Sequence, residues 1–425
     1  MQDYLSRRDF MKLSSVLVST LIIDNALNTA FALSPIMHFK DSDKTLRLLS
    51  LNCWGLPFLP NRINRMEAIG REIGSGKYDV IGLQEIWSRD DWMLVSGLAR
   101  DGGLKFSTYY PSGAIGSGLG IISRYPILDT DFKRFTVCGK PQNVFHGDYY
   151  GGKGIALARI NTDFGDIDFY TTHFIAKYSL KDEYFAHRIA QAVDLVKFVS
   201  STQKNGISVV LGDINSEPDS LEYQIIKNLG DFTDCFNYLH PDDPGYTTSD
   251  LNSYTPKSRK RRIDYIFVKS NSSEKLSIMQ SEVTMKFMDN SDNSFSDHFG
   301  IFASFEKGTS QPEIVQPKSS PDNFAFQSEL ISKTLNQIDE GIKDAKWRQG
   351  LHTNKAIAGL LSIPLSRRIN QDVLDNSRLG QIIVNTIESF APIYSFSELL
   401  LALSATNEEI NGLELVRNYL TTWTH

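Results

Sequence analysis

The sequence is poor in cysteine. Only three cysteines occur among 425 residues, at Cys53, Cys138 and Cys235, and they are far apart in the chain. Their odd number and wide spacing exclude a disulfide framework, and no CxxC or cysteine–histidine pattern of a zinc site is present. We therefore expect the fold to rest on an apolar core, for which 41% hydrophobic residues are sufficient.

Two further absences concern membranes and nucleic acids. The longest apolar run, Leu13–Ile23, has about half of the roughly 20 residues that a membrane-spanning helix needs. We therefore expect no transmembrane segment in the mature chain. The formal net charge is −6, which gives no general attraction to the phosphate backbone of a nucleic acid. Nucleic acid is therefore not an expected partner, and the oligomeric state stays open.

The N-terminus carries three features in the order of an export signal. The pair Arg7-Arg8 precedes the apolar run, and Ala30-Phe31-Ala32 follows it. This arrangement resembles a twin-arginine signal peptide ending in a signal-peptidase site. We expect residues 1–32 to be this signal, residues 33–45 to lead into the fold, and the mature protein to be periplasmic or secreted.

The middle of the chain alternates short apolar strands with turns and a few helices. Two stretches have apolar residues at helical spacing, Asn61–Ile73 and Asp182–Val199. Apolar runs bounded by turn residues predict eight strands, at Leu46–Leu51, Val80–Leu83, Gly120–Ser123, Ile155–Ile160, Ile167–Thr172, Val209–Leu211, Ile263–Val268 and Gly300–Phe305. Many strands with helices between them favour a layered α/β sandwich. We place this domain at residues 46–308.

The last part of the chain has a different character. Gln311–Asp322 is rich in proline, serine and charge, which indicates a linker, placed at residues 309–323. Apolar residues at helical spacing follow, and they predict helices at Phe326–Trp347, Lys355–Leu361, Leu379–Phe390 and Ser397–Ser404. We therefore expect a small all-α C-terminal domain at residues 324–425, and we find no chemical motif in it.

Polar side chains follow several of the predicted strands. Asn52 and Glu85 each stand at a strand end, where two oxygen donors can share a hard cation such as Mg²⁺. Asp213 and Asn215 come two residues apart after another strand, so an extended chain directs both to the same side. Either group is also typical of a turn that closes a buried strand.

Histidines and carboxylates complete this set. His173 ends a strand, Asp264 precedes one, and Asp297 is followed directly by His298. A buried carboxylate that orients an imidazole is a common device for proton transfer. Each residue alone is weak evidence, because a single histidine at a strand end is more often a packing or surface residue. The order of all these motifs, each at a strand end, is far more specific.

In this order the motifs resemble the endonuclease/exonuclease/phosphatase superfamily. The resemblance implies an α+β fold of the DNase I-like type, a four-layered α/β/β/α sandwich. Further stretches resemble its neutral sphingomyelinase branch: Leu51–Pro57 (LNCWGLP), the glycine-rich Gly116–Gly120 with Ser123–Ile127, Tyr184–Ala192, and His146–Gly154 (HGDYYGGKG). In the last of these, the resemblance implies a switching pair of Asp148 and Lys153. From the residues alone, a mobile hairpin with a solvated lysine is the alternative.

The resemblance implies a phospholipase C that hydrolyses sphingomyelin to ceramide and phosphocholine at a membrane surface. Mg²⁺, or alternatively Mn²⁺, would bind Glu85, with Asn52 and Asp297 contributing. His298, oriented by Asp264, would take the proton of the attacking water.

In the same scheme Asp213 and Asn215 would position the water and the phosphoryl group, and His173 would donate to a phosphoryl oxygen. The alternatives are a phospholipase C for another choline phospholipid or its lyso form, a secreted nuclease, and a lipid-binding protein without activity.

Overall fold

The computed structural model describes residues 45–424, apart from residues 114–115, 117, 180, 205, 256–259, 271–275, 290, 308–320 and 375–376. The predicted export signal and most of the predicted linker lie outside the described residues. Within the described part, no helix has the length and apolar character needed to cross a bilayer. All three cysteines are buried and free, as their number and spacing indicate.

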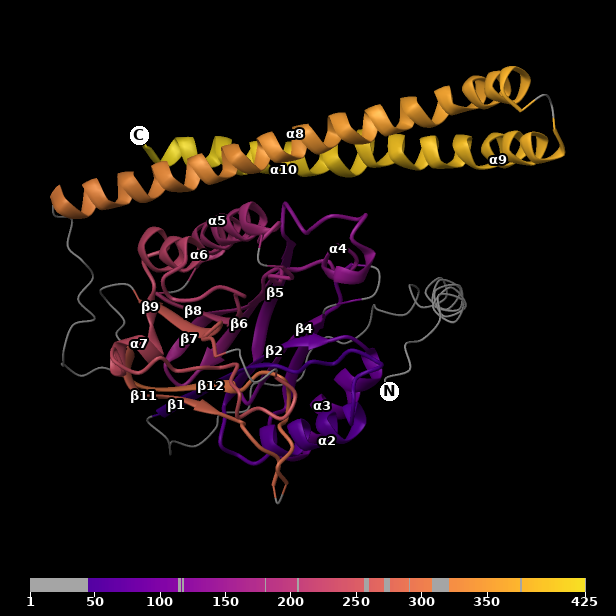
Figure 1. The fold of residues 1–425 in the computed structure, drawn as a ribbon. Coiled ribbons are helices and arrows are strands. Elements are labelled where there is room, and N and C mark those ends of the chain that lie inside the picture. Colours follow the sequence, from indigo (N-terminus) through magenta and orange to yellow (C-terminus); the bar gives the residue numbers. More distant parts are fainter. Residues whose placement is uncertain are drawn as a thin grey trace. The chain divides into compact units, whose positions relative to one another are not determined.

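Two six-stranded sheets form the centre of the fold (Figure 1). The first sheet has the order β11-β12-β1-β2-β4-β3, with strands β1 (Thr45–Asn52), β2 (Val80–Ile86), β3 (Phe106–Tyr110), β4 (Gly118–Ser123), β11 (Leu276–Thr284) and β12 (Gly300–Lys307). The second has the order β5-β6-β7-β8-β10-β9, with β5 (Ile127–Arg134), β6 (Gly154–Thr162), β7 (Gly165–His173), β8 (Ile207–Asp213), β9 (Thr233–Asp234) and β10 (Asp264–Ser270).

Helices cover the outer faces of both sheets. Helices α2 (Arg62–Ile73) and α3 (Arg89–Asp101) pack on the first sheet through a core that includes Met66, Ile81 and Val95. Helix α5 (Phe185–Thr202) packs on the second sheet. A third core fills the space between the sheets. The α/β/β/α order of layers confirms the predicted DNase I-like sandwich.

Shorter helices connect these layers. They are η1 (Val144–His146), α4 (Asp148–Gly151), α6 (Leu221–Gln224), the π-helix η2 (Ile225–Leu229) and α7 (Cys235–Leu239). Ser220 caps α6 by accepting a hydrogen bond from the Tyr223 amide, and Asp234 caps α7 by accepting from the amides of Phe236 and Asn237. Such caps satisfy amides at a helix start that have no partner within the helix.

The C-terminal region is helical, as predicted. It consists of α8 (Pro321–Asp372), α9 (Arg378–Leu400), the π-helix η3 (Leu401–Ala405), α10 (Thr406–Thr421) and η4 (Thr422–Thr424). Helices α8 and α9 lie side by side (Figure 1). Ile338 and Ile342 of α8 and Leu413 and Val416 of α10 join the core around α5. Part of the helical region therefore shares a core with the sandwich.

All eight predicted strands and both predicted helices of the sandwich exist. The strands β3, β5, β9 and β11 and helix α3 were not predicted. Most of β5 is exposed, and β11 carries a bulge between Ile278 and Gln280, so neither has a clean apolar pattern. In the C-terminal region, Phe326–Trp347 and Lys355–Leu361 belong to one continuous helix, and α10 was not predicted.

Candidate active site

Strand pairing brings the predicted polar residues to one edge of the sandwich. In the first sheet β1 and β2 are parallel, and Asn52 at the end of β1 pairs with Gln84, so that Glu85 comes next to it. In the second sheet β7 and β8 are parallel, and His173 pairs with Asp213. Strand β10 runs antiparallel to β8, and its first residue, Asp264, also pairs with Asp213. The same edge therefore receives side chains from the middle strands of both sheets.

Asn52 joins the two sheets by hydrogen bonds. Its side-chain Nδ2 donates to Glu85 Oε1 at 3.2 Å and to Asp213 Oδ2 at 3.1 Å, and its Oδ1 accepts from the Trp54 amide at 3.0 Å. The amide oxygen is therefore engaged by the backbone, and the amide nitrogen faces the carboxylates. In this arrangement Glu85 offers oxygens to a cation, and Asn52 holds Glu85 and Asp213 in place.

The backbone at this edge is unusual. Trp54, Glu85 and Asn215 all have positive φ angles, of 48°, 57° and 51°. Residues other than glycine seldom adopt this conformation, and such strain gathers at functional sites. The pairing of β2 with β4 is also irregular between Leu83 and Ile86, which changes the direction of the Glu85 side chain. A side chain at Gly55 would collide with the carbonyl oxygen of Glu85, so only glycine fits there.

Asp213 lies at the centre of the cluster. Its Oδ1 accepts from the Asn215 amide at 2.8 Å, and its Oδ2 lies 3.4 Å from His173 Nε2 and 3.9 Å from His298 Nε2. Burial by itself would raise the pKa of Asp213, but His298, His173 and Lys153 outweigh it and hold that pKa below its usual range. Asp213 is therefore a buried carboxylate kept ionised by its neighbours.

Asp264 holds His298. His298 Nδ1 lies 2.8 Å from Asp264 Oδ2, and Asp264 is fully buried. Burial alone would lower the pKa of His298, but the carboxylates of Asp264, Asp213 and Asp297 raise it well above its ordinary value. Burial raises the pKa of Asp264. The imidazole thus has one nitrogen fixed by a carboxylate, and its Nε2 faces the centre of the cluster, as proton transfer requires.

A second chain of contacts leads from His173 to the loop before β6. Lys153 Nζ lies 2.6 Å from His173 Nε2 and 2.9 Å from Asp148 Oδ1. Asp148 Oδ2 accepts from the Tyr178 hydroxyl at 2.7 Å. Asp148 and Lys153 are both buried, so the alternative of a solvated lysine on a mobile hairpin is wrong.

In the part of the chain that the structure describes, the Asp297 side chain forms no hydrogen bond or ion pair with the other predicted side chains. Its Oδ1 accepts from Ser296 Oγ at 3.3 Å. Burial raises the pKa of Asp297 to about 7, and the charges of Glu85 and Asp213 add to this effect. The site thus gathers four carboxylates, those of Glu85, Asp213, Asp264 and Asp297, at one buried edge.

This donor set suits a metal ion. Oxygen atoms of Asp213 and Asp264 and a nitrogen of His298 lie within 4.8 Å of one another and can hold a cation. This group differs from the predicted ligands Glu85, Asn52 and Asp297, although Asn52 bonds both Glu85 and Asp213. Carboxylate oxygens are the donors that Mg²⁺ and Mn²⁺ prefer. A divalent cation would also offset the repulsion that raises the pKa of Asp297.

Three supporting residues were not predicted. The Trp87 indole donates to Glu85 Oε2 at 3.3 Å, the Tyr178 hydroxyl binds Asp148, and Thr247 Oγ1 accepts from the Asp264 amide at 3.3 Å. Trp87 lies two residues after Glu85, so its position was a usable signal. Tyr178 and Thr247 lie in irregular loops, where no periodic pattern identifies a contact.

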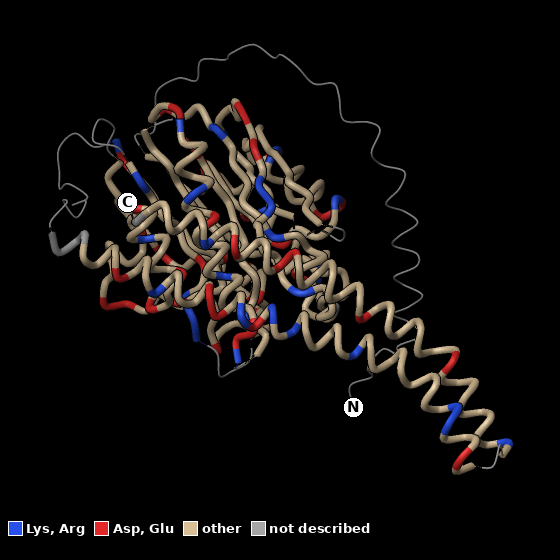
Figure 2. The backbone as a smooth tube through the Cα atoms, turned by 90° about the horizontal axis from the view of Figure 1, so that it is seen from above, with Lys and Arg blue, Asp and Glu red and all other residues tan. Residues whose placement is uncertain are grey.

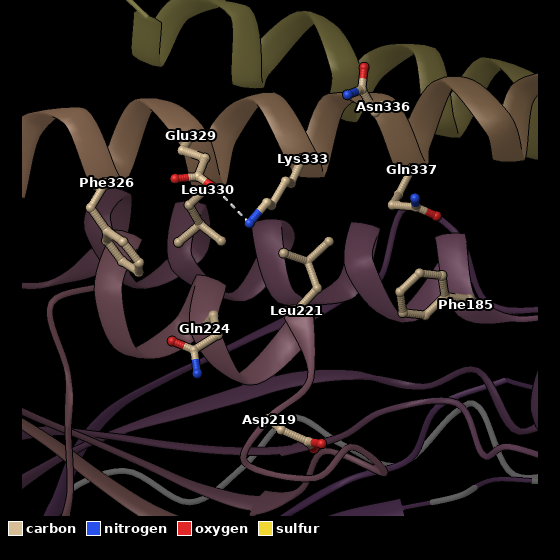
Figure 3. A pocket seen from close by; sticks show the side chains of 10 residues that line it. All are labelled: Phe185, Asp219, Leu221, Gln224, Phe326, Glu329, Leu330, Lys333, Asn336 and Gln337. Carbon is tan, nitrogen blue, oxygen red and sulfur yellow. Dashed lines mark ion pairs between the residues drawn. The ribbon is translucent and has the colours of Figure 1, made fainter.

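A cavity lies away from this edge. It has a volume of about 590 Å³ and lies between α8 and the helices α5 and α6 (Figure 3). Its lining includes Phe185, Leu221, Leu330 and Lys333, and it contains none of the predicted site residues. The cluster of carboxylates and histidines, and not this cavity, is therefore the candidate active site.

Several known proteins are similar to this chain in sequence. A putative neutral sphingomyelinase of Drosophila melanogaster is 32% identical over 284 residues, which cover 64% of this chain and 63% of that protein. Sphingomyelin phosphodiesterase 2 of Homo sapiens is 31% identical, over 71% of this chain and 74% of its own. An inositol phosphosphingolipids phospholipase C of Schizosaccharomyces pombe is 31% identical, over 75% and 80%. The chain thus spans a little under two thirds of the fly relative.

A solved structure and a family model agree on the fold. A crystal structure of D. rerio TDP2 with a single-strand DNA product matches with a TM-score of 0.50 at 18% identity, over 62% of this chain and all of that one. At this identity the likeness shows the fold alone. The family model described as the Endonuclease/Exonuclease/phosphatase family matches residues 49–298. This range includes all residues of the cluster, from Asn52 to His298. The chain belongs to the Endonuclease/Exonuclease/phosphatase family.

Proposed function

We propose that the protein is a Mg²⁺-dependent phospholipase C that hydrolyses sphingomyelin to ceramide and phosphocholine. The observation that carries the proposal is the pairing of His173, Asp213 and Asp264 across three neighbouring strands, with His298 held on Asp264 at 2.8 Å. The names of the relatives, two of which are sphingomyelin-cleaving and one of which cleaves inositol phosphosphingolipids, support the substrate class.

Each residue of the cluster has its own role in the proposed reaction. Water attacks phosphorus, and its proton passes to His298 Nε2 while Asp264 stabilises the imidazolium at Nδ1. Asp213 and Asn215 orient the water and a phosphoryl oxygen. His173, with Lys153 behind it, donates to the phosphoryl group as negative charge develops. The bond from phosphorus to the ceramide oxygen breaks, and that oxygen takes up a proton.

A bound metal ion would balance the negative charge of the carboxylates in the cluster. When bound, Mg²⁺ supplies positive charge that neutralises the carboxylates and the developing charge on the phosphodiester. We assign Glu85 as a ligand of the metal ion. Asn52 would fix the orientation of the Glu85 carboxylate, and Asp297 would contribute a further carboxylate. The raised pKa of His298 reflects the three carboxylates around it, so that pKa should fall when their charge is offset, which leaves the imidazole free to accept a proton.

The proposal extends to where the protein acts. The Arg7-Arg8 pair, the apolar run and the Ala30-Phe31-Ala32 site support export by the twin-arginine route. The substrate would then be a lipid of a membrane outside the cytoplasm.

A substrate panel tests the proposal. Purified protein with Mg²⁺ is incubated separately with sphingomyelin, phosphatidylcholine, lysophosphatidylcholine, an inositol phosphosphingolipid and plasmid DNA, and the released headgroup or nicked DNA is measured. We expect phosphocholine release from sphingomyelin to exceed every other reaction. Faster release of inositol phosphate would indicate that the preferred substrate is an inositol phosphosphingolipid, as the name of the yeast relative suggests for that protein. DNA nicking without lipid hydrolysis would overturn the proposal.

A further inference from the structure

We propose that the part of the α8–α9 hairpin at residues 349–405 is a lipid-docking element that inserts its outward apolar side chains into a neutral membrane surface. This projecting hairpin has its largest apolar side chains on the outside. Of the thirty-one large apolar side chains that are exposed among the described residues, seventeen lie in this hairpin, from Leu351 to Leu403. Monomeric soluble proteins rarely expose apolar surface on this scale, and such patches mark docking sites.

The seam between the two helices is built from small and polar residues instead. Its buried members include Ala356, Asn370, Ala391 and Ser395. At Gly359 an added side chain would collide with Ser395, and at Gly380 with Asn370, so the helices approach closely. His352 and Glu398 also pair across the seam at 2.6 Å. A helical hairpin in water normally packs its large apolar residues in the seam. The reverse order, small inside and large outside, is that of helices in lipid.

The spread of the exposed apolar side chains favours lipid over a second protein. At 100° per residue, those on α9 cover about 220° of its circumference. They include Leu379, Ile383, Phe390 and Ile393. A second copy of the chain would cover one side of the helix, whereas a fluid lipid layer can surround most of it. An arc this wide exceeds the apolar stripe of about 100° with which a helix usually packs on a single partner.

The charges of the projecting hairpin are few and balanced (Figure 2). Residues 349–405 contain four basic and four acidic side chains. Several are already paired, as in Arg367 with Glu388 at 2.5 Å and Arg368 with Asp372 at 3.3 Å. An anionic membrane is therefore not required, because attraction to such lipids comes from clusters of unpaired lysine and arginine. The polar side chains between the apolar ones are typical of a helix that lies at the interface.

The projecting hairpin leaves the sandwich at the end where the active site lies. Strand β7 ends at His173, and α5 begins shortly after it, at Phe185. The first turn of α5 meets α10, with His187 Nε2 3.3 Å from Glu409, while Lys197 near the other end of α5 lies over the ring of Tyr419. Helix α10 thus runs parallel to α5, and its start lies near the active-site end.

Helix α8 passes the same point. A side chain at Gly341 would touch Ala186 of α5, and Arg348 pairs with Glu409 at 2.7 Å. After Arg348, α8 continues for about 36 Å at 1.5 Å per residue. This length projects past the first turn of α5. An enzyme whose substrate lies in a bilayer would in this way be held by the hairpin with its active-site end near the lipid.

The test uses the full chain and vesicles of phosphatidylcholine and sphingomyelin, in EDTA so that no turnover occurs. The docking variant carries Leu379→Gln, Ile383→Gln, Phe390→Gln and Ile393→Gln. The matched control carries Ile63→Gln, Met93→Gln, Leu128→Gln and Met279→Gln, which are equally exposed apolar residues of the sandwich. We expect the wild-type and control proteins to float with the vesicles, and the docking variant to partition at least about 10-fold less.

Two results would overturn the inference. One is equal flotation of all three proteins. The other is a wild-type dimer by light scattering that the docking variant converts to a monomer, without flotation of either, which would assign the surface to a second copy. The inference rests on the proposed function for the choice of lipid only. A protein that floats but releases no phosphocholine would refute the proposed function and leave the docking element standing.

Discussion

Phe305 on β12 is fully buried between the two sheets, whereas Phe390 on α9 has 66% of its surface exposed. The same contrast holds for the regions to which they belong. In the sandwich the apolar residues lie inside, and the polar residues that matter gather at one edge. In the projecting hairpin the small and polar residues lie inside, and the apolar residues lie outside. The sandwich is therefore packed as a protein in water is, and the projecting hairpin is packed as helices in lipid are.

Removal of the metal should affect the sandwich and the projecting hairpin more differently than any other change. With excess EDTA we expect turnover to fall to the background, because the four carboxylates of the cluster lose the charge that offsets them. Vesicle binding should not change, because no hydrogen bond or ion pair among the described residues joins the hairpin to the cluster. Phosphocholine release and flotation are measured on the same sample. Restoration of turnover by added Mg²⁺ is the control, and turnover that resists EDTA would contradict the metal assignment.

Matched alanine substitutions should reveal the two packing schemes through stability. We expect Phe305→Ala to lower the free energy of unfolding by about 3–5 kcal/mol, because it leaves a cavity in the core. Phe390→Ala should change it by no more than about 0.5 kcal/mol in water. Urea unfolding of both variants measures the difference. Equal losses would mean that Phe390 is buried in solution, against the docking account.

The contact between α5 and α10 should show a smaller, pH-dependent effect. Burial lowers the pKa of His187 to about 4, whereas the unfolded chain has a value near 6.5. Between these values the unfolded chain binds a proton that the folded chain does not. Stability should therefore be full above about pH 6.5 and fall by up to about 1.4 kcal/mol per pH unit on acidification toward pH 4.

The substitution His187→Gln isolates this effect. Its thermal midpoint should depend less on pH between 4 and 6.5 than that of the wild-type protein, whatever its absolute stability. Parallel curves for the two proteins would show that His187 is not the group responsible. Arg348 and Glu409 contact the same place and stay unchanged in both proteins.

The sequence was sufficient for the sandwich and its polar edge because both obey local rules. Strands such as Val209–Leu211 are continuous apolar runs, and Asp213 follows this one after a single glycine. The loop residues were harder: Tyr178 reaches Asp148 across 30 positions, and no periodic pattern encodes that contact. The direction of the Asn52 amide depends on the Trp54 backbone, which only the folded chain defines.

The hairpin was only partly predicted, for a physical reason. Helical spacing was visible in Phe326–Trp347 and Leu379–Phe390, and the helices exist. The spacing predicted a small all-α domain but not which residues lie between its helices. Because Gly359, Gly380 and Ser395 lie in the seam, the outward position of Phe390 could not be inferred from spacing.

The central claim is that His298, held by Asp264, takes the proton of the water that cleaves sphingomyelin. The direct test is the rate of phosphocholine release by His298→Ala, with Mg²⁺ and sphingomyelin vesicles, alongside thermal unfolding of the same protein. We predict a loss of about 10²- to 10⁴-fold in turnover with an unfolded fraction no larger than that of the wild type. A folded His298→Ala protein that hydrolyses sphingomyelin at the wild-type rate would contradict the account.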